Sequence, residues 1–163
     1  MALFKLTCFG VWMVYWCCLV FGHGENLCSS ELLIHSNITA ALQSDVLLTC
    51  NFHPTLLGSD KTADIAVVWT QRNTTTHILL EISLLGDVRS WDHKGGRIKT
   101  FPKLSESGNF SILLQKVQLY DLSLYHCELF NGFNCSIAFQ EIQLGFAFPS
   151  LMDPSSQQQQ QQQ

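Results

Sequence analysis

The sequence is poor in charge and has no cluster of basic side chains. Charged residues make up 13% of the chain, acidic residues outnumber basic ones, and the formal net charge is −4. Proteins that bind nucleic acid through its phosphates need a basic patch or stripe. We therefore expect no nucleic-acid partner.

The sequence also lacks the common motifs of catalysis and of metal binding. It contains no H-E-x-x-H and no G-x-S-x-G, and its six histidines are scattered without a pair at metal-ligand spacing. The cysteines are better suited to disulfide bridges than to a catalytic role. These absences predict a protein that is not an enzyme and that needs no metal or cofactor.

Long apolar runs are missing outside the first two dozen residues. Residues 1–24 have the form of a secretory signal peptide, with Lys5 before the apolar run Leu6–Phe21 and small residues at Gly22 and Gly24. An uncleaved signal anchor is the alternative, although the run is shorter than the ~20 residues of a typical spanning helix. Cleavage would give a secreted, extracellular protein without a membrane span, and retention would give a cell-surface protein.

The chain has seven cysteines, an odd number. Three of them lie in the predicted signal peptide: Cys8, Cys17 and Cys18. The four that remain form an even set in an oxidising compartment: Cys28, Cys50, Cys127 and Cys135. Four cysteines allow three pairings. Two free thiols or an intermolecular bridge are the alternatives to a second disulfide.

Short segments with alternating apolar residues, separated by turns rich in Gly, Pro, Asn and Asp, fill most of the remaining chain. The expected strands are 31–39, 46–52, 65–72, 77–82, 83–91, 97–101, 110–116, 124–130 and 135–144. Residues 53–64 are expected to form a long loop, and Asn131-Gly132 a hairpin turn. The apolar pattern slips between Phe139 and Ile142, which predicts a bulge. The pattern predicts an all-β sandwich of two antiparallel sheets.

One segment, Val117–Cys127, has the spacing D-x-x-x-Y-x-C, formed by Asp121, Tyr125 and Cys127. Cys50 and Trp69 precede it in the order Cys…Trp…Cys. With Asp45–Cys50 and Gly108–Val117, these residues resemble the V-set of the immunoglobulin superfamily. The resemblance implies a V-type sandwich with Greek-key connections, which we assign to residues 25–146.

The resemblance implies a structural role for each of these residues. Cys50 and Cys127 would bridge the two sheets, and Trp69 would pack against the sulfur atoms. Tyr125 would return its hydroxyl to the backbone at the corner before its strand. Cys28 would then pair with Cys135, because the first and last strands of variable-type domains run side by side. Arg97 would form a structural ion pair with Asp121.

Within the superfamily, Gly108–Val117 is most similar to the membrane-distal V domains of butyrophilin-like and co-stimulatory ligands of leukocytes. The last strand lacks the F-G-x-G motif of antigen-receptor variable domains, and Ser123 stands where the family usually has Gly. Such ligands usually carry a second immunoglobulin domain and a transmembrane helix, which this sequence does not contain. A secreted form, a truncated product and an incomplete gene model are therefore alternatives.

V-set domains commonly bind another immunoglobulin domain through the sheet formed by strands G, F, C and C′, which correspond here to the expected strands 135–144, 124–130, 65–72 and 77–82. By this resemblance, the expected partner-binding residues are Val68, Thr70, Arg72, His126, Glu128, Phe130 and Phe133. Aromatic and arginine side chains are frequent anchors in protein interfaces. His126 could tune binding with pH, but we expect it to be a plain exposed strand residue. Phe130 could instead cover a loop or the first strand.

Four N-x-S/T sequons, at Asn37, Asn73, Asn109 and Asn134, are permitted glycosylation sites in a secreted protein. Asn134 is the least favourable, because Cys135 is its middle residue. Residues 147–163 end in seven glutamines and are expected to form a disordered polar tail.

Together these features predict an extracellular protein-recognition module. We expect it to bind another cell-surface protein of the immunoglobulin superfamily and to act in leukocyte signalling, such as regulation of the T-cell response. A homophilic adhesion module that forms a weak homodimer is one alternative. A soluble decoy, or a truncated form of a membrane protein, is the other.

Overall fold

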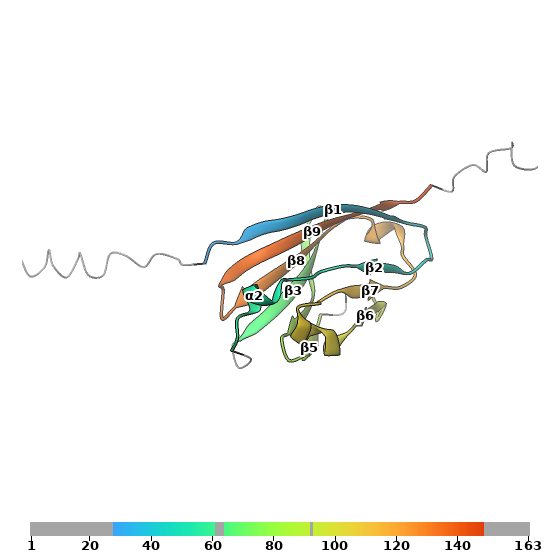
Figure 1. Ribbon diagram of the computed structural model, residues 1–163. Helices are drawn as coiled ribbons and strands as arrows, with labels where there is room; N and C mark the ends of the chain where they lie inside the picture. Colours follow the sequence, from blue (N-terminus) through green and yellow to red (C-terminus); the bar gives the residue numbers. More distant parts are fainter. Residues whose placement is uncertain (1–27, 61–63, 92, 149–163) are drawn as a thin grey trace, which may run out of the picture.

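The computed structural model describes residues 28–60, 64–91 and 93–148, which form two packed β-sheets (Figure 1). The strands are β1 (Glu31–Ala40), β2 (Val46–Leu48), β3 (Ile65–Arg72), β4 (Thr76–Ser83), β5 (Val88–Ser90), β6 (Ile98–Thr100), β7 (Ile112–Leu114), β8 (Leu124–Asn131) and β9 (Ser136–Phe146). A one-turn helix, α2 (Pro54–Leu57), follows β2, and 3₁₀ turns occupy Pro102–Ser107 and Leu119–Asp121. The predicted signal peptide, and the predicted tail beyond residue 148, lie outside the described residues.

The larger sheet has six strands in the order β1-β9-β8-β3-β4-β5, and the smaller has three in the order β2-β7-β6. All pairs of neighbouring strands are antiparallel except β1 and β9, which run in parallel. Figure 1 shows the blue β1 beside the red β9, so the first and last strands of the domain are neighbours. The predicted β-sandwich is confirmed.

Alternating side chains of the strands build the core between the two sheets. In β3, Ile65, Val67 and Trp69 point inward and are buried, whereas the residues between them are partly exposed. Trp69 Nε1 donates a hydrogen bond to the Phe110 carbonyl at 2.9 Å, which satisfies the polar atom of this buried ring. Each fully buried apolar side chain of this size contributes about 1.5–3 kcal/mol to folding.

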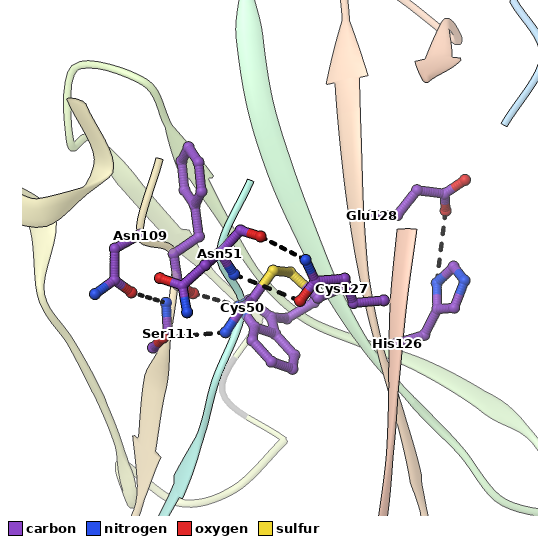
Figure 2. Close-up of a disulfide and its surroundings, with 10 residues drawn as sticks. Cys50, Asn51, Asn109, Ser111, His126, Cys127 and Glu128 are labelled. Carbon is purple, nitrogen blue, oxygen red and sulfur yellow. Dashed lines mark hydrogen bonds and ion pairs between the residues drawn. A yellow bond between two sulfur atoms is a disulfide. The ribbon is translucent and has the colours of Figure 1, made fainter. Parts of the chain in front are cut away.

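Both predicted disulfides are present. Cys50–Cys127 joins the two sheets with a Cα–Cα distance of 6.5 Å (Figure 2). Cys28–Cys135 joins the residues just before β1 and β9, with a Cα–Cα distance of 5.1 Å. The second bridge therefore holds the beginnings of two parallel strands together.

Several strand boundaries differ from the sequence prediction. The predicted strand 83–91 is interrupted by a turn at Gly86, which has a φ of 91°; Ser83 ends β4, and only β5 forms a separate strand. The predicted loop 53–64 contains α2, which begins at Pro54 and is capped by His53 Nδ1 accepting from the Thr55 N–H at 3.3 Å. The predicted strand 46–52 pairs regularly only as far as Leu48.

The predicted bulge between Phe139 and Ile142 is wrong. The pairing of β9 with β8 runs without interruption from Ala138 to Gln143, and the irregularity lies earlier, before Ala138. Inward positions alternate regularly, but one of them is Gln140, a buried polar residue. A glutamine at an inward position made the apolar pattern appear to slip.

Gln140 has a specific partner across the core. Its side-chain Nε2 donates to the Asn51 carbonyl at 2.5 Å, and its Oε1 accepts from the Asn51 N–H at 3.4 Å. Asn51 follows β2, which is at the edge of the three-stranded sheet because β1 pairs with β9. The carboxamide of Gln140 thus gives Asn51 the pair of hydrogen bonds that a neighbouring strand would otherwise provide.

Candidate functional site

The outer surface of the six-stranded sheet, here called the front face, carries all the predicted partner-binding residues except Phe133. Because β3 and β8 are neighbours, Val68 lies opposite Glu128 and Thr70 lies opposite His126. Phe133 lies in the turn between β8 and β9 and is 92% exposed. The structure therefore gathers residues from distant parts of the sequence on one surface and at one end of it.

His126 lies on the front face, but the prediction that it is exposed is wrong. It is only 3% exposed, because Phe139 of β9 packs against the imidazole with ring centroids 4.6 Å apart. Its Nδ1 lies 3.8 Å from Glu128 Oε2, a contact drawn in Figure 2, and has no hydrogen-bond partner. Thr70 Oγ1, on the opposite strand, is also buried without a partner.

The surroundings of His126 favour its neutral form. Burial lowers the pKa of His126 below its ordinary value, and the charge of Arg72 lowers it further. Glu128 and Glu141 act in the opposite direction without outweighing these two effects. His126 is therefore an uncharged imidazole at neutral pH, beside two carboxylates and one guanidinium.

Sequence reasoning missed three side chains of this surface, Phe139, Glu141 and His35. Glu141 Oε1 lies 4.0 Å from Arg72 Nη1, and its Oε2 lies 3.3 Å from His35 Nδ1. Had the alternation in 135–144 been taken as unbroken, Phe139 and Glu141 would have been assigned to the outer face. His35 belongs there because β1 is the neighbour of β9.

The aromatic side chains of the predicted cluster differ in exposure. Phe130 is half-buried, whereas Phe133 projects from the turn that contains Gly132 at φ 76° and Asn134 at φ 58°. The Cys28–Cys135 bridge lies at the end of this turn and ties it to the beginning of β1. Phe133 is thus an exposed aromatic ring on a covalently anchored turn.

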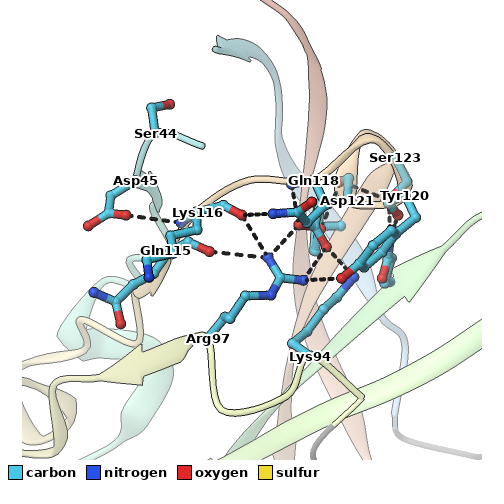
Figure 3. A network of polar contacts seen from close by, with 12 residues as sticks. Ser44, Asp45, Lys94, Arg97, Gln115, Lys116, Gln118, Tyr120, Asp121 and Ser123 are labelled. Carbon is cyan, nitrogen blue, oxygen red and sulfur yellow. Dashed lines mark hydrogen bonds and ion pairs between the residues drawn. The ribbon is translucent and has the colours of Figure 1, made fainter. Parts of the chain in front are cut away.

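A second polar cluster lies just before the beginning of β8, at the end of that strand far from Phe133. It surrounds the carboxylate of Asp121 and is here called the E–F corner (Figure 3). Arg97 donates to this carboxylate from Nη1 at 2.7 Å and from Nη2 at 3.2 Å. Lys94 Nζ donates at 2.7 Å, and the Gln118 N–H donates at 2.8 Å. Tyr125 donates its hydroxyl to the Asp121 carbonyl at 2.8 Å. Sequence reasoning missed Lys94 and Gln118 as members of this cluster.

The E–F corner keeps Asp121 ionised although its side chain is fully buried. Burial would raise the pKa of Asp121, but the hydrogen bonds from Arg97, Lys94 and the Gln118 N–H outweigh burial and lower the pKa. The carboxylate is therefore compensated by two cations and a backbone donor. The arrangement is structural, because the Asp121 side chain has no surface exposed to solvent that a ligand could contact.

Comparison with known proteins identifies the family. A profile of the immunoglobulin V-set domain matches residues 35–145, which is more than half of the chain. The chain belongs to the V-set family. V-set domains are typically recognition modules without catalytic activity. No curated protein sequence matches this chain significantly.

The V-set fold is also found by structural comparison. The crystal structure of the human B7-H4 IgV-like domain superposes with a TM-score of 0.51 and 20% sequence identity, covering 72% of this chain and 91% of that one. This likeness establishes the fold alone. In all, 1989 chains of solved structures match.

The sequon asparagines of this V-set domain lie in different environments. Asn37 on β1, Asn73 after β3 and Asn134 after β8 are exposed. Asn109 is half-buried, and its Oδ1 accepts from the Ser111 N–H at 3.1 Å, while the buried Ser111 hydroxyl accepts from the Cys50 N–H at 3.0 Å. The Asn109 sequon therefore also serves the fold.

Among residues 28–60, 64–91 and 93–148, no group of His, Cys, Asp and Glu side chains is arranged to hold a metal ion. The same residues include no helix with the length and apolar character that crossing a membrane requires. The two disulfides fit a protein of the extracellular space.

Proposed function

We propose that this V-set domain binds another cell-surface protein through its front face and the β8–β9 turn. Two exposed side chains carry the proposal, Phe133 in the turn and Arg72 on β3. Arg72 has 44% of its side chain exposed, and among the described residues its only ion pair is a 4.0 Å contact with Glu141. Aromatic rings and arginines are enriched among the residues that dominate binding energy.

The charge distribution of the front face supports a specific partner. Arg72, Glu128 and Glu141 present both signs of charge around apolar Val68 and Phe130. Mixed charge around an apolar centre resembles the rim and core of protein interfaces. A partner with complementary charges would be oriented by this pattern.

Leukocyte signalling is the setting that we infer for this interaction. The similarity of Gly108–Val117 to butyrophilin-like and co-stimulatory ligands supports it. The T-cell response is the process on which we expect the domain to act.

The test is binding of the purified full chain to leukocytes, measured by flow cytometry with fluorescent protein. The double variant R72A/F130A and the single variant Phe133→Ser should each weaken binding by about 2 kcal/mol or more, roughly thirtyfold in affinity. Leu119→Ser is the matched control, because Leu119 is 69% exposed at the E–F corner, away from the front face. Unchanged binding by both folded front-face variants would contradict the proposal.

Homophilic adhesion is a second candidate, favoured by a separate observation. β1 is an edge strand of the six-stranded sheet, and its Leu32, Leu33 and Ile34 are 46%, 39% and 51% exposed. Exposed edge strands can pair with another copy of the same chain. Sedimentation velocity should then show a dimer, and the Leu33→Lys variant should be a monomer. A wild-type protein that is monomeric at all concentrations would contradict homophilic adhesion and favour binding to a different protein.

An extracellular location is part of the proposal. Expression in a secretory cell line should deliver the protein to the medium, with its N-terminus near Glu25. Recovery in the membrane fraction with residues 1–24 intact would instead indicate a signal anchor and a cell-surface protein.

A further inference from the structure

The end of the domain opposite the β8–β9 turn contains a polar cavity of about 270 Å³. Its lining comes from the end of β3, the β3–β4 turn, the beginning of β4, the loop before β6 and the E–F corner: Gln71, Asn73, Thr74, Thr75, His77, His93, Lys94 and Tyr120. This cavity is slightly below the roughly 300–1,000 Å³ of common ligand pockets. A single sugar ring is of a suitable size.

The walls of the cavity are fixed by contacts within the fold. Gln71 is buried and donates its amide to the Tyr120 carbonyl at 2.8 Å and to the Ser123 hydroxyl at 2.6 Å. The rings of His77 and His93 lie with centroids 5.5 Å apart, and Thr75 Oγ1 lies 2.7 Å from His77 Nε2. The site is therefore preformed by side chains that are held in place.

The chemistry of the lining suits a carbohydrate. Tyr120 is 60% exposed, and Lys94 and Arg97 lie over its ring at 5.4 Å, which holds the ring in place. Aromatic rings can pack against the apolar C–H groups of a sugar, while hydroxyl, amide and imidazole groups can bond its hydroxyls and acetamide. Both kinds of group line this one cavity.

Asn73 supplies the link between the cavity and a sugar. It begins the sequon Asn73-Thr74-Thr75, all three residues of which line the cavity and are exposed. The Asn73 N–H donates to the Thr75 carbonyl at 3.0 Å, so the sequon forms a tight turn at the cavity mouth. A glycan attached to Asn73 would start where the cavity opens.

We propose that Asn73 carries an N-linked glycan and that its first N-acetylglucosamine occupies this cavity, packed against Tyr120 and His93. The transfer forms a bond between Asn73 Nδ2 and the anomeric carbon of the sugar. It breaks the bond from that carbon to the phosphate of a lipid-pyrophosphate oligosaccharide donor, and the Nδ2 proton is released with the lipid pyrophosphate. The inference rests on the proposed extracellular location.

Asn37 provides the natural comparison within the chain. It is an exposed sequon asparagine on β1, outside the lining of the cavity. A glycan at Asn37 would extend into solvent, whereas the innermost sugar at Asn73 would be covered by the protein. The two sites should therefore differ in how readily a glycosidase reaches the bond between asparagine and sugar.

The experiment uses the full chain expressed in a glycosylating secretory cell line. Site-resolved mass spectrometry follows the release of each glycan by peptide-N-glycosidase from native and from denatured protein. Release at Asn73 should be at least about tenfold slower in the native protein, since a shielded bond is cleaved only from the open population. Release at Asn37 should differ little between the two forms.

Tyr120→Ala should raise native release at Asn73 to the rate at Asn37 and leave the Asn37 rate unchanged. Because Tyr120 also bonds Arg97 at 3.1 Å, His93→Ser serves as a second variant should Tyr120→Ala fail to fold. A glycan at Asn73 that is released as fast as the glycan at Asn37 would overturn this inference alone. Secreted protein with Asn73 unmodified would also overturn it, whereas failure of the protein to reach the medium or the cell surface would overturn the extracellular location as well.

Discussion

The E–F corner and the front face both contain charged and polar side chains, but these groups differ in how fully they are hydrogen-bonded. At the corner the buried Asp121 carboxylate accepts hydrogen bonds from Arg97, Lys94 and the Gln118 backbone. On the front face Thr70 Oγ1 and His126 Nδ1 are buried without partners, and Arg72 has only a 4.0 Å ionic contact. The carboxylate at the corner is thus compensated within the fold, whereas two buried polar atoms of the front face are not.

Removing the centre of the E–F corner should have the largest effect. Asp121→Ala leaves Lys94 and Arg97 without their shared anion, so we expect a loss of about 3–5 kcal/mol in the free energy of unfolding. Urea denaturation of the folded protein measures this loss. Asp87→Ala, at an exposed carboxylate, is the control and should change stability by less than about 0.5 kcal/mol. Equal effects of the two substitutions would contradict the structural role of the corner.

The pH dependence at the corner has a definite sign. The pKa of Asp121 is lower in the folded protein than in the unfolded chain. Its contribution is therefore present above the unfolded pKa and is lost as the pH falls through the folded pKa. The Asp121→Ala variant should lack this part of the acid sensitivity.

The disulfide at the end of the front face should have the next largest effect. The double variant C28S/C135S removes a crosslink between residues separated by 107 positions, and we expect a loss of about 2–4 kcal/mol. Thermal unfolding with the Cys50–Cys127 bridge intact measures it. The variant should also weaken leukocyte binding, because the Phe133 turn loses its anchor. Full stability and binding in the variant would show that the second bridge is dispensable.

A substitution of Gln140 tests a polar contact in the core between the two sheets. Gln140→Leu leaves the Asn51 N–H and carbonyl without these partners, so we expect a loss of about 1–3 kcal/mol. Gln143→Leu on the same strand is the control, because Gln143 is exposed. If both leucine variants unfold at the same urea concentration, the Gln140 contact contributes nothing to stability.

His126 should give the smallest effect, visible as a pH dependence. Its pKa is lower in the folded protein than in the unfolded chain, so stability should fall as the pH drops below about 6.5, where the unfolded chain takes up the proton. His126→Leu should flatten this slope, whereas His35→Gln, at an exposed histidine, should keep it. Parallel slopes for wild type and His126→Leu would contradict the buried neutral imidazole.

Much of the fold could be predicted because its signals are local or have fixed spacing. The alternation of Val67 and Trp69 assigns an inward face, and the spacing of Asp121, Tyr125 and Cys127 marks the corner. Both disulfides followed from the family order of strands. These features depend on patterns that a single sequence contains.

The parts that could not be predicted depend on neighbours that are distant in sequence. Alternation places His126 on the outer face, but only the position of Phe139 on the adjacent strand determines that it is buried. Lys94 reaches Asp121 from 27 residues away, and no motif marks it. Gln140 was misinterpreted because its partner, Asn51, lies 89 residues away in the sequence, just after β2.

The Cys28–Cys135 bridge also determines how the domain would carry mechanical load. Tension applied between the chain before Cys28 and the chain after Phe146 passes through the sulfur–sulfur bond and then along β9. The loop between the two cysteines, which includes β1 and most of the core strands, lies outside this path. Pulling on the two ends would therefore strain one covalent link and β9, the strand that supplies Phe139 and Glu141 to the front face, while the E–F corner stays unloaded until β9 is pulled from the sheet.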